Sequence, residues 1–171
     1  FLSSPFSSST ILLHLYLSST ISLTDLALKF KNKCSKSNVG SFYTDVLKKQ
    51  MNVDITFQNT GGIRSDLNAG DILKREIYSI DPFNNGSVTY TLSIAEIKNF
   101  LKQSKIAIYY AGVNISQTNE TIEIRNKNNQ LLSDNSTLTV GLNDYIPAVY
   151  DTYFTQTPTI KPYTTAEGLI E

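Results

Sequence analysis

VDITFQNTGGIRSDL, residues 53–67, contains an abrupt change of pattern from which the rest of the chain can be read. Apolar and polar residues alternate over residues 53–58, which is typical of a β-strand with one buried face. A loop follows at residues 59–62, where two glycines let the backbone approach another molecule closely. Arg64 comes next, and its guanidinium can hold a phosphate or carboxylate through two hydrogen bonds. The pattern predicts a strand that ends in an anion-handling loop or, more simply, in a tight turn beside an exposed arginine.

The composition limits the chemistry available to the chain. Its 171 residues suit one domain with a sizeable core, and 15 Lys+Arg balance 15 Asp+Glu, so no overall charge attracts nucleic acid or an anionic membrane. Cys34 is the single cysteine and His14 the single histidine. They support neither an internal disulfide nor a cluster of transition-metal ligands. We therefore expect the chain to bind no metal or other cofactor itself.

Hydrophobic patterns predict a mixture of helices and strands. Residues 37–51 carry apolar side chains at helical spacing, and Ser93 with Glu96 has the spacing of a capping box before a second helix. Further strands are predicted at residues 86–93, 106–115 (with Gly112 as a bulge), 121–124 and 137–142. The predicted fold class is α+β, with a mixed sheet of five or six strands and two to three packed helices.

The chain divides into three parts. Residues 1–22 are Ser-rich, and their apolar core at residues 11–17 is shorter than the roughly 20 apolar residues that span a bilayer. This part is left unassigned, as the start of a fragment or a residual targeting segment. Residues 23–156 are predicted to form the folded domain, beginning with a short helix at residues 24–30. Residues 157–171 are predicted to be an extended tail.

Phe83 lies in the loop sequence DPFNNG, residues 81–86. Proline, asparagine and glycine keep this segment out of regular structure, so the ring is presented by a loop. Such a ring either plugs the edge of the core or offers a stacking face to a planar ligand. Its own sequence leaves both readings open.

Several spaced motifs resemble the C-terminal domain of the 5′-nucleotidase family. The family has an N-G-G-G-I-R loop, similar to NTGGIR at residues 59–64, and then a P-F pair, similar to Pro82-Phe83. A second family signature has an Asn and an aromatic residue with an Asp six residues after the aromatic, and it resembles Asn143, Tyr145 and Asp151. The resemblance covers residues 37–154, most of the chain.

The resemblance implies a catalytic context. These enzymes hydrolyse nucleoside 5′-monophosphates, and related members act on nucleotide sugars or cyclic nucleotides. A separate N-terminal domain holds two divalent metal ions and a catalytic histidine, and the C-terminal domain presents the substrate to them. By this resemblance the partners are a nucleoside monophosphate or related nucleotide and the missing N-terminal domain. The resemblance also implies an extracellular or cell-surface location. From the charge balance and the short apolar segment we expect no nucleic acid polymer as a partner and no transmembrane helix.

The same resemblance assigns roles to five residues. The rings of Phe83 and Tyr145 would stack on the two faces of the base. Arg64 would contact the phosphate side, Asn59 the base edge, and Asp151 the ribose hydroxyls. Each residue type suits its role, because flat rings stack on any base and a guanidinium pairs with phosphate oxygens.

The loop itself shows where this sequence departs from the family. Gly61 and Gly62 would form the loop, but Thr60 replaces one glycine of the family triplet. The glycines that the family places around its aspartate are missing beside Asp151, and a second family arginine falls near Ser35. These changes keep two alternatives open: a non-catalytic nucleotide-binding or cell-surface module, and a structural domain whose two rings only pack. We expect this chain by itself to hydrolyse nothing.

Overall fold

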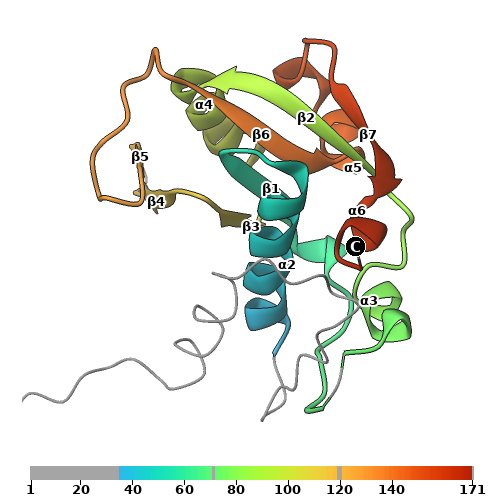
Figure 1. The fold of residues 1–171 in the computed structure, drawn as a ribbon. Helices are drawn as coiled ribbons and strands as arrows, with labels where there is room; N and C mark the ends of the chain where they lie inside the picture. The colour runs from blue at the N-terminus through green and yellow to red at the C-terminus, as the bar shows by residue number, and fades with distance from the viewer. Residues whose placement is uncertain (1–34, 71, 119–120, 171) are drawn as a thin grey trace, which may run out of the picture.

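A computed structural model describes residues 35–70, 72–118 and 121–170 (Figure 1). The strands are β1 (Ile55–Asn59), β2 (Gly86–Ser93), β3 (Ile108–Ala111), β4 (Asn114–Gln117), β5 (Ile122–Arg125), β6 (Thr137–Asn143) and β7 (Thr159–Thr164). The helices are α2 (Lys36–Met51), α3 (Lys74–Ile80), α4 (Ile94–Ser104), α5 (Tyr145–Val149) and α6 (Thr165–Gly168), with 3₁₀ turns η1 (Thr60–Gly62) and η2 (Asp151–Tyr153). Five strands form a mixed sheet in the order β3-β1-β6-β2-β7. The predicted α+β fold with a mixed sheet is confirmed.

The strand directions bring three chain segments to one end of this sheet. β1 and β6 run parallel, with Thr56 opposite Gly141, so the two strands end side by side. β2 runs antiparallel to β6, with Ser87 opposite Asn143, so β2 begins where β6 ends. Residues that follow β1 and β6 and residues that precede β2 therefore meet, although they lie far apart in the sequence.

β1 is buried on both faces, whereas its alternating sequence predicted one buried face. Ile55 and Phe57 belong to the core that includes Phe100 of α4. On the other face, Thr56 Oγ1 donates to the carbonyl oxygen of Thr44 in α2 at 2.7 Å. Polar side chains on a buried face are stable when they are hydrogen-bonded in this way. α4 and α2 therefore cover opposite faces of the sheet.

The capping box predicted before the second helix is confirmed. Ser93 Oγ accepts from the backbone N–H of Glu96 at 3.2 Å, and Glu96 Oε2 accepts from the backbone N–H of Ser93 at 2.7 Å. The Ser93 hydroxyl also donates to Glu96 Oε2 at 2.7 Å, and this bond together with that from the Ser93 N–H favours the charged carboxylate and lowers the pKa of Glu96. α4 therefore begins directly at the end of β2.

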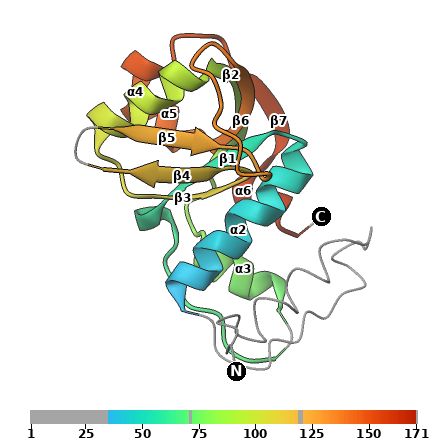
Figure 2. The ribbon, with the colours of Figure 1, turned by 90° about the vertical axis from the view of Figure 1, so that its left-hand side faces the viewer.

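Residues 106–115, predicted as one strand with a bulge, form parts of two strands. β3 ends at Ala111, and Gly112 has a φ of +104°, which glycine adopts without the strain that a side chain would bring. The chain then enters β4, which pairs with β5 as a ribbon beside β3 (Figure 2). A side chain at position 112 would also collide with the carbonyl oxygen of Asp54, which is a second reason for a glycine here. The chain bends at this glycine between two strands, whereas the sequence predicted a bulge within one strand.

Residues 157–170, predicted to belong to an extended tail, are integrated into the fold. β7 pairs with β2, with Val88 opposite Ile160, and α6 buries Ala166 and Leu169 beside α2 and α3 (Figure 1). β7 tolerates a proline because it is an edge strand, where an N–H can be missing. The unassigned residues 1–22 and the helix predicted at residues 24–30 lie outside the described residues.

Candidate functional site

A network of side-chain amides joins the ends of β1 and β6. Asn143 is fully buried, and its Nδ2 donates to Gln58 Oε1 at 2.9 Å and to Asn59 Oδ1 at 3.0 Å. Asn143 Oδ1 accepts from the backbone N–H of Ile146 at 3.0 Å, in the first turn of α5. Because Oδ1 of Asn59 is held by Asn143, the Nδ2 of Asn59 is the group that this residue can offer to a ligand.

Arg64 lies across the ring of Phe83. Its backbone N–H donates to the carbonyl oxygen of Ile80 at 2.8 Å, which ties the residue after the loop to the end of α3. Its Nη1 donates to the carbonyl oxygen of Gly61 at 3.3 Å, and its guanidinium carbon lies 5.7 Å from the centre of the Phe83 ring. This is a cation–π contact. A guanidinium has five N–H donors, so others remain for an anion.

Phe83 is held by a loop, and its ring is not part of the core. The loop joins α3 to β2, and the Phe83 backbone N–H donates to Asp81 Oδ1 at 3.3 Å. The side chain is 49% exposed, so it does not plug the edge of the core. The ring presents an aromatic face at the surface, next to a positive charge.

Tyr145 begins α5 and its side chain is 48% exposed. The residues on either side of it are hydrogen-bonded through their backbones. Asp144 N–H donates to the carbonyl oxygen of Gly86 at 2.9 Å, and Ile146 N–H donates to Asn143 Oδ1. The contact with Gly86 places Tyr145 beside the start of β2, just beyond the loop that carries Phe83. Both rings are therefore exposed at the same end of the sheet.

Asp151 lies in the segment that follows α5. It is exposed and begins η2, one short turn beyond α5. The neighbouring rings of Tyr150 and Tyr153 both lie 5.8 Å from the ring of Phe100 in α4, measured between ring centres. The segment is thus anchored on α4, and the hydrogen bonds of Asn59 and Arg64 given above are made to other residues. The structure brings Asn59, Arg64, Phe83 and Tyr145 to one end of the sheet and holds Asp151 on a separate turn.

The two glycines of the loop are under different constraints. A Cβ at Gly62 would collide with Nε2 of Gln58 and lie 3.0 Å from Oδ1 of Asn59, whereas the nearest atom to a Cβ at Gly61 is 3.7 Å away. Thr60 fits in the 3₁₀ turn, where its backbone N–H donates to the carbonyl oxygen of Ala107 at 2.9 Å. The substitution of Thr60 for a family glycine therefore leaves the turn formed.

Sequence reasoning missed two residues of this site and gave a third no role. Gln58 and Asp81 are fully buried, and Asn143 joins the two strands. Gln58 directly precedes the motif NTGGIR, and Asp81 directly precedes the pair Pro82-Phe83. These positions are the one signal in the sequence that could have pointed to the two residues. Their burial depends on strand pairing between distant segments, which local patterns do not report.

The described residues contain no group of three or more His, Cys, Asp or Glu side chains that could hold a metal ion. Within the same ranges of the chain, no helix has the length and apolar character needed to cross a membrane. The side chains at this end of the sheet include amides, the guanidinium of Arg64, two exposed aromatic rings and the exposed carboxylate of Asp144. A guanidinium can pair with an anion and an amide N–H can donate to one, while an aromatic ring offers a face for stacking.

The five-stranded mixed sheet, with helices on both of its faces, defines an α+β domain. The sequence profile described as "5'-nucleotidase, C-terminal domain" matches residues 20–156, and the chain belongs to this family. The resemblance inferred from NTGGIR, Pro82-Phe83 and the Asn143 signature is thereby confirmed.

Individual relatives agree with this assignment. A NAD 5′-nucleotidase of Haemophilus influenzae is 29% identical over 157 residues, which cover 75% of this chain and 26% of that protein. Among solved structures, a 5′-nucleotidase precursor from Thermus thermophilus matches with a TM-score of 0.70 and 19% identity, over 94% of this chain and 39% of its own. The Haemophilus influenzae NAD nucleotidase structure matches with a TM-score of 0.63 and 23% identity, over 77% and 29%. This chain thus spans well under half the length of these relatives.

Proposed function

We propose that this chain is the nucleotide-binding domain of a 5′-nucleotidase-type phosphatase that hydrolyses nucleoside 5′-monophosphates. The observation that supports the proposal most directly is the guanidinium of Arg64 over the half-exposed ring of Phe83. An aromatic face beside a cation suits a base and a phosphate carried by one small molecule. Family membership supplies the reaction class.

Each residue has a part in this proposal. Phe83 and Tyr145 stack on the base, and Asn59, whose Oδ1 is already held by Asn143, donates from Nδ2 to the base edge. Arg64 pairs with the phosphate. Asp151 accepts from the ribose hydroxyls, which requires the ligand to extend from the sheet end toward η2.

Catalysis belongs to another part of the enzyme in this proposal. Two divalent metal ions in a separate domain would supply the Lewis acid and the nucleophile. The chain described above would bind and orient the substrate, and the complete enzyme would act outside the cell or at its surface. We expect the 171-residue chain to release no phosphate from AMP when divalent metal ions are added. Turnover by the purified chain would contradict this division of roles.

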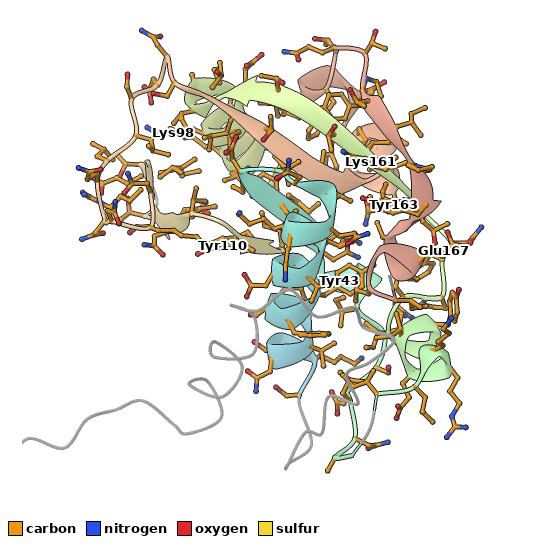
Figure 3. The ribbon with its side chains drawn as sticks, viewed as in Figure 1. Tyr43, Lys98, Tyr110, Lys161, Tyr163 and Glu167 are labelled. Atoms are coloured by element: carbon orange, nitrogen blue, oxygen red, sulfur yellow. The ribbon has the colours of Figure 1, made fainter. Side chains whose placement is uncertain are left out.

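Calorimetric titration of the 171-residue chain with AMP, adenosine and NAD tests the binding role. NAD is included because a relative is named a NAD 5′-nucleotidase. Stacking on an aromatic ring contributes about 1–3 kcal/mol per base, so Phe83→Ala and Tyr145→Ala should each weaken binding by roughly tenfold. Tyr110→Ala is the control, since Tyr110 is an exposed ring on β3, an edge strand of the sheet that carries none of the proposed site residues (Figure 3).

Two results would contradict the proposal. One is the absence of binding at millimolar ligand, and the other is equal affinity of wild type, Phe83→Ala and Tyr145→Ala. The second result would favour a structural domain whose rings have no ligand. Binding without hydrolysis after a metal-binding domain is supplied would favour the non-catalytic module.

A further inference from the structure

We propose that Thr165 and Asp81 form an anchor that sets the position of the Phe83 loop, so that the C-terminal segment helps to build the nucleotide site. The effect of this anchor on nucleotide binding rests on the proposed function, but the contact between Thr165 and Asp81 is present in the chain without a ligand. Asp81 and Thr165 are both fully buried and lie 84 residues apart in the sequence.

Thr165 is bonded to both ends of the loop that carries Phe83. Its Oγ1 donates to Asp81 Oδ2 at 2.6 Å, and its backbone N–H donates to the carbonyl oxygen of Asn85 at 2.9 Å. Gly86 then pairs with Thr164 as β2 begins. One residue at the start of α6 therefore closes residues 81–85 into a fixed loop.

Asp81 has a donor for each of its carboxylate oxygens. Tyr43 Oη donates to Oδ2, as Thr165 does, and the backbone N–H of Phe83 donates to Oδ1. Tyr43 projects from α2 on the side of α6 (Figure 3). Burial, reinforced by the charge of Asp81, raises the pKa of Tyr43 well above its usual range, so its hydroxyl remains a donor at neutral pH.

A buried carboxylate is costly without hydrogen bonds, so Asp81 is restrained to the one position where its donors meet. Pro82 separates it from Phe83, and the proline ring restricts φ to about −65°. A displacement of Asp81 would therefore be passed to the Phe83 ring and to its contact with Arg64. This makes Asp81 and Thr165 positioning residues for the ring.

This role lies outside what the motifs indicate. The family profile ends at residue 156, and Thr165 follows it in the segment that the sequence predicted to be a tail. Asp81 itself touches no ligand group, because its side chain is fully buried and its oxygens are taken by protein donors.

The test uses a reporter placed in the loop. The chain contains no tryptophan, so Phe83→Trp provides a single indole whose emission and anisotropy report the loop without any ligand. In this background, Thr165→Val removes the hydroxyl at nearly constant shape, and we expect a red-shifted emission and a lower anisotropy. Thr165→Ser restores the donor and should match the parent. Thr159→Val makes the same change at an exposed position of β7 and should also match.

Nucleotide affinity is then measured with Phe83 in place. Loss of preorganisation in Thr165→Val should weaken AMP binding by roughly three- to tenfold, with rescue by Thr165→Ser. If Thr165→Val does not fold, Asp81→Asn is measured in the same way. Unchanged indole signals in a folded Thr165→Val or Asp81→Asn chain would overturn the anchor. A changed indole signal in a chain that binds no nucleotide would support the anchor and overturn only the proposed function.

Discussion

Gln58 Oε1 accepts a hydrogen bond from Asn143 Nδ2 at 2.9 Å, across 85 residues of sequence. The bond links two parallel strands at the end where the exposed rings and Arg64 gather. The same Asn143 side chain reaches Asn59 on β1 and Ile146 on α5. The Asn143 amide therefore couples the loop after β1 to the helix that carries Tyr145. A substitution of this buried residue is expected to disturb the exposed residues of the candidate site.

Asn143→Ala should destabilise the chain. The buried acceptor on Gln58, the partly buried acceptor on Asn59 and one buried N–H would lose their partner, and we expect the free energy of unfolding to fall by about 2–4 kcal/mol. Urea denaturation measures the change. Asn128→Ala, on an exposed turn, is the matched control and should change stability by less than about 0.5 kcal/mol. Equal stabilities of the two variants would show that the amide network does not hold the strand ends.

Gly62→Ala should be more harmful than Gly61→Ala. A Cβ at position 62 meets Gln58 Nε2 and Asn59 Oδ1, so the amide network has to shift, at a cost of about 1–3 kcal/mol. Position 61 has room for a methyl group, and we expect less than about 1 kcal/mol there. Thermal and urea unfolding of the two variants give the comparison. A destabilisation at position 61 as large as at position 62 would contradict the packing described for the loop.

Arg64→Ala should weaken AMP binding by roughly tenfold and adenosine binding by less than about threefold. The reason is that, in the proposed function, the guanidinium pairs with the phosphate, which adenosine lacks. Arg75→Ala removes an exposed arginine from α3 and is the control. Titrations at low and high salt should show the larger salt dependence for AMP. An equal loss for both ligands would place Arg64 away from the phosphate.

Stability should fall at alkaline pH through Tyr43. Burial and Asp81 raise its pKa above the unfolded value of about 10, so its protonated form is favoured by folding. Its contribution is fully present below pH ~10 and is lost as the pH rises through the folded pKa. Tyr43→Phe should lower stability by about 1–3 kcal/mol at pH 7, because Asp81 loses a donor, and should flatten the alkaline decline. Urea midpoints at neutral and alkaline pH measure both effects. A decline of the same steepness in Tyr43→Phe would assign it to other groups.

Local patterns were sufficient to place the strand β1, the turn after it, the long helix before β1 and the capping box of α4. Alternation, turn residues and caps act over a few neighbouring residues, so the sequence alone specifies them. The spaced motifs also sufficed for the family, because NTGGIR and Pro82-Phe83 can be recognised without knowing how the chain folds.

Only the tertiary structure showed which polar side chains are buried and where the C-terminal segment packs, because both depend on contacts between distant segments. Burial of Gln58 and Asp81, the pairing of β7 with β2, and the two bonds of Thr165 to the Phe83 loop all depend on elements that are remote in sequence. Whether a polar side chain ends in water or inside a hydrogen-bonded network depends on which strands lie beside it, and no local pattern contains that information. The residues of the candidate site could therefore be proposed from the sequence, but the interior groups that hold them in place required the folded molecule.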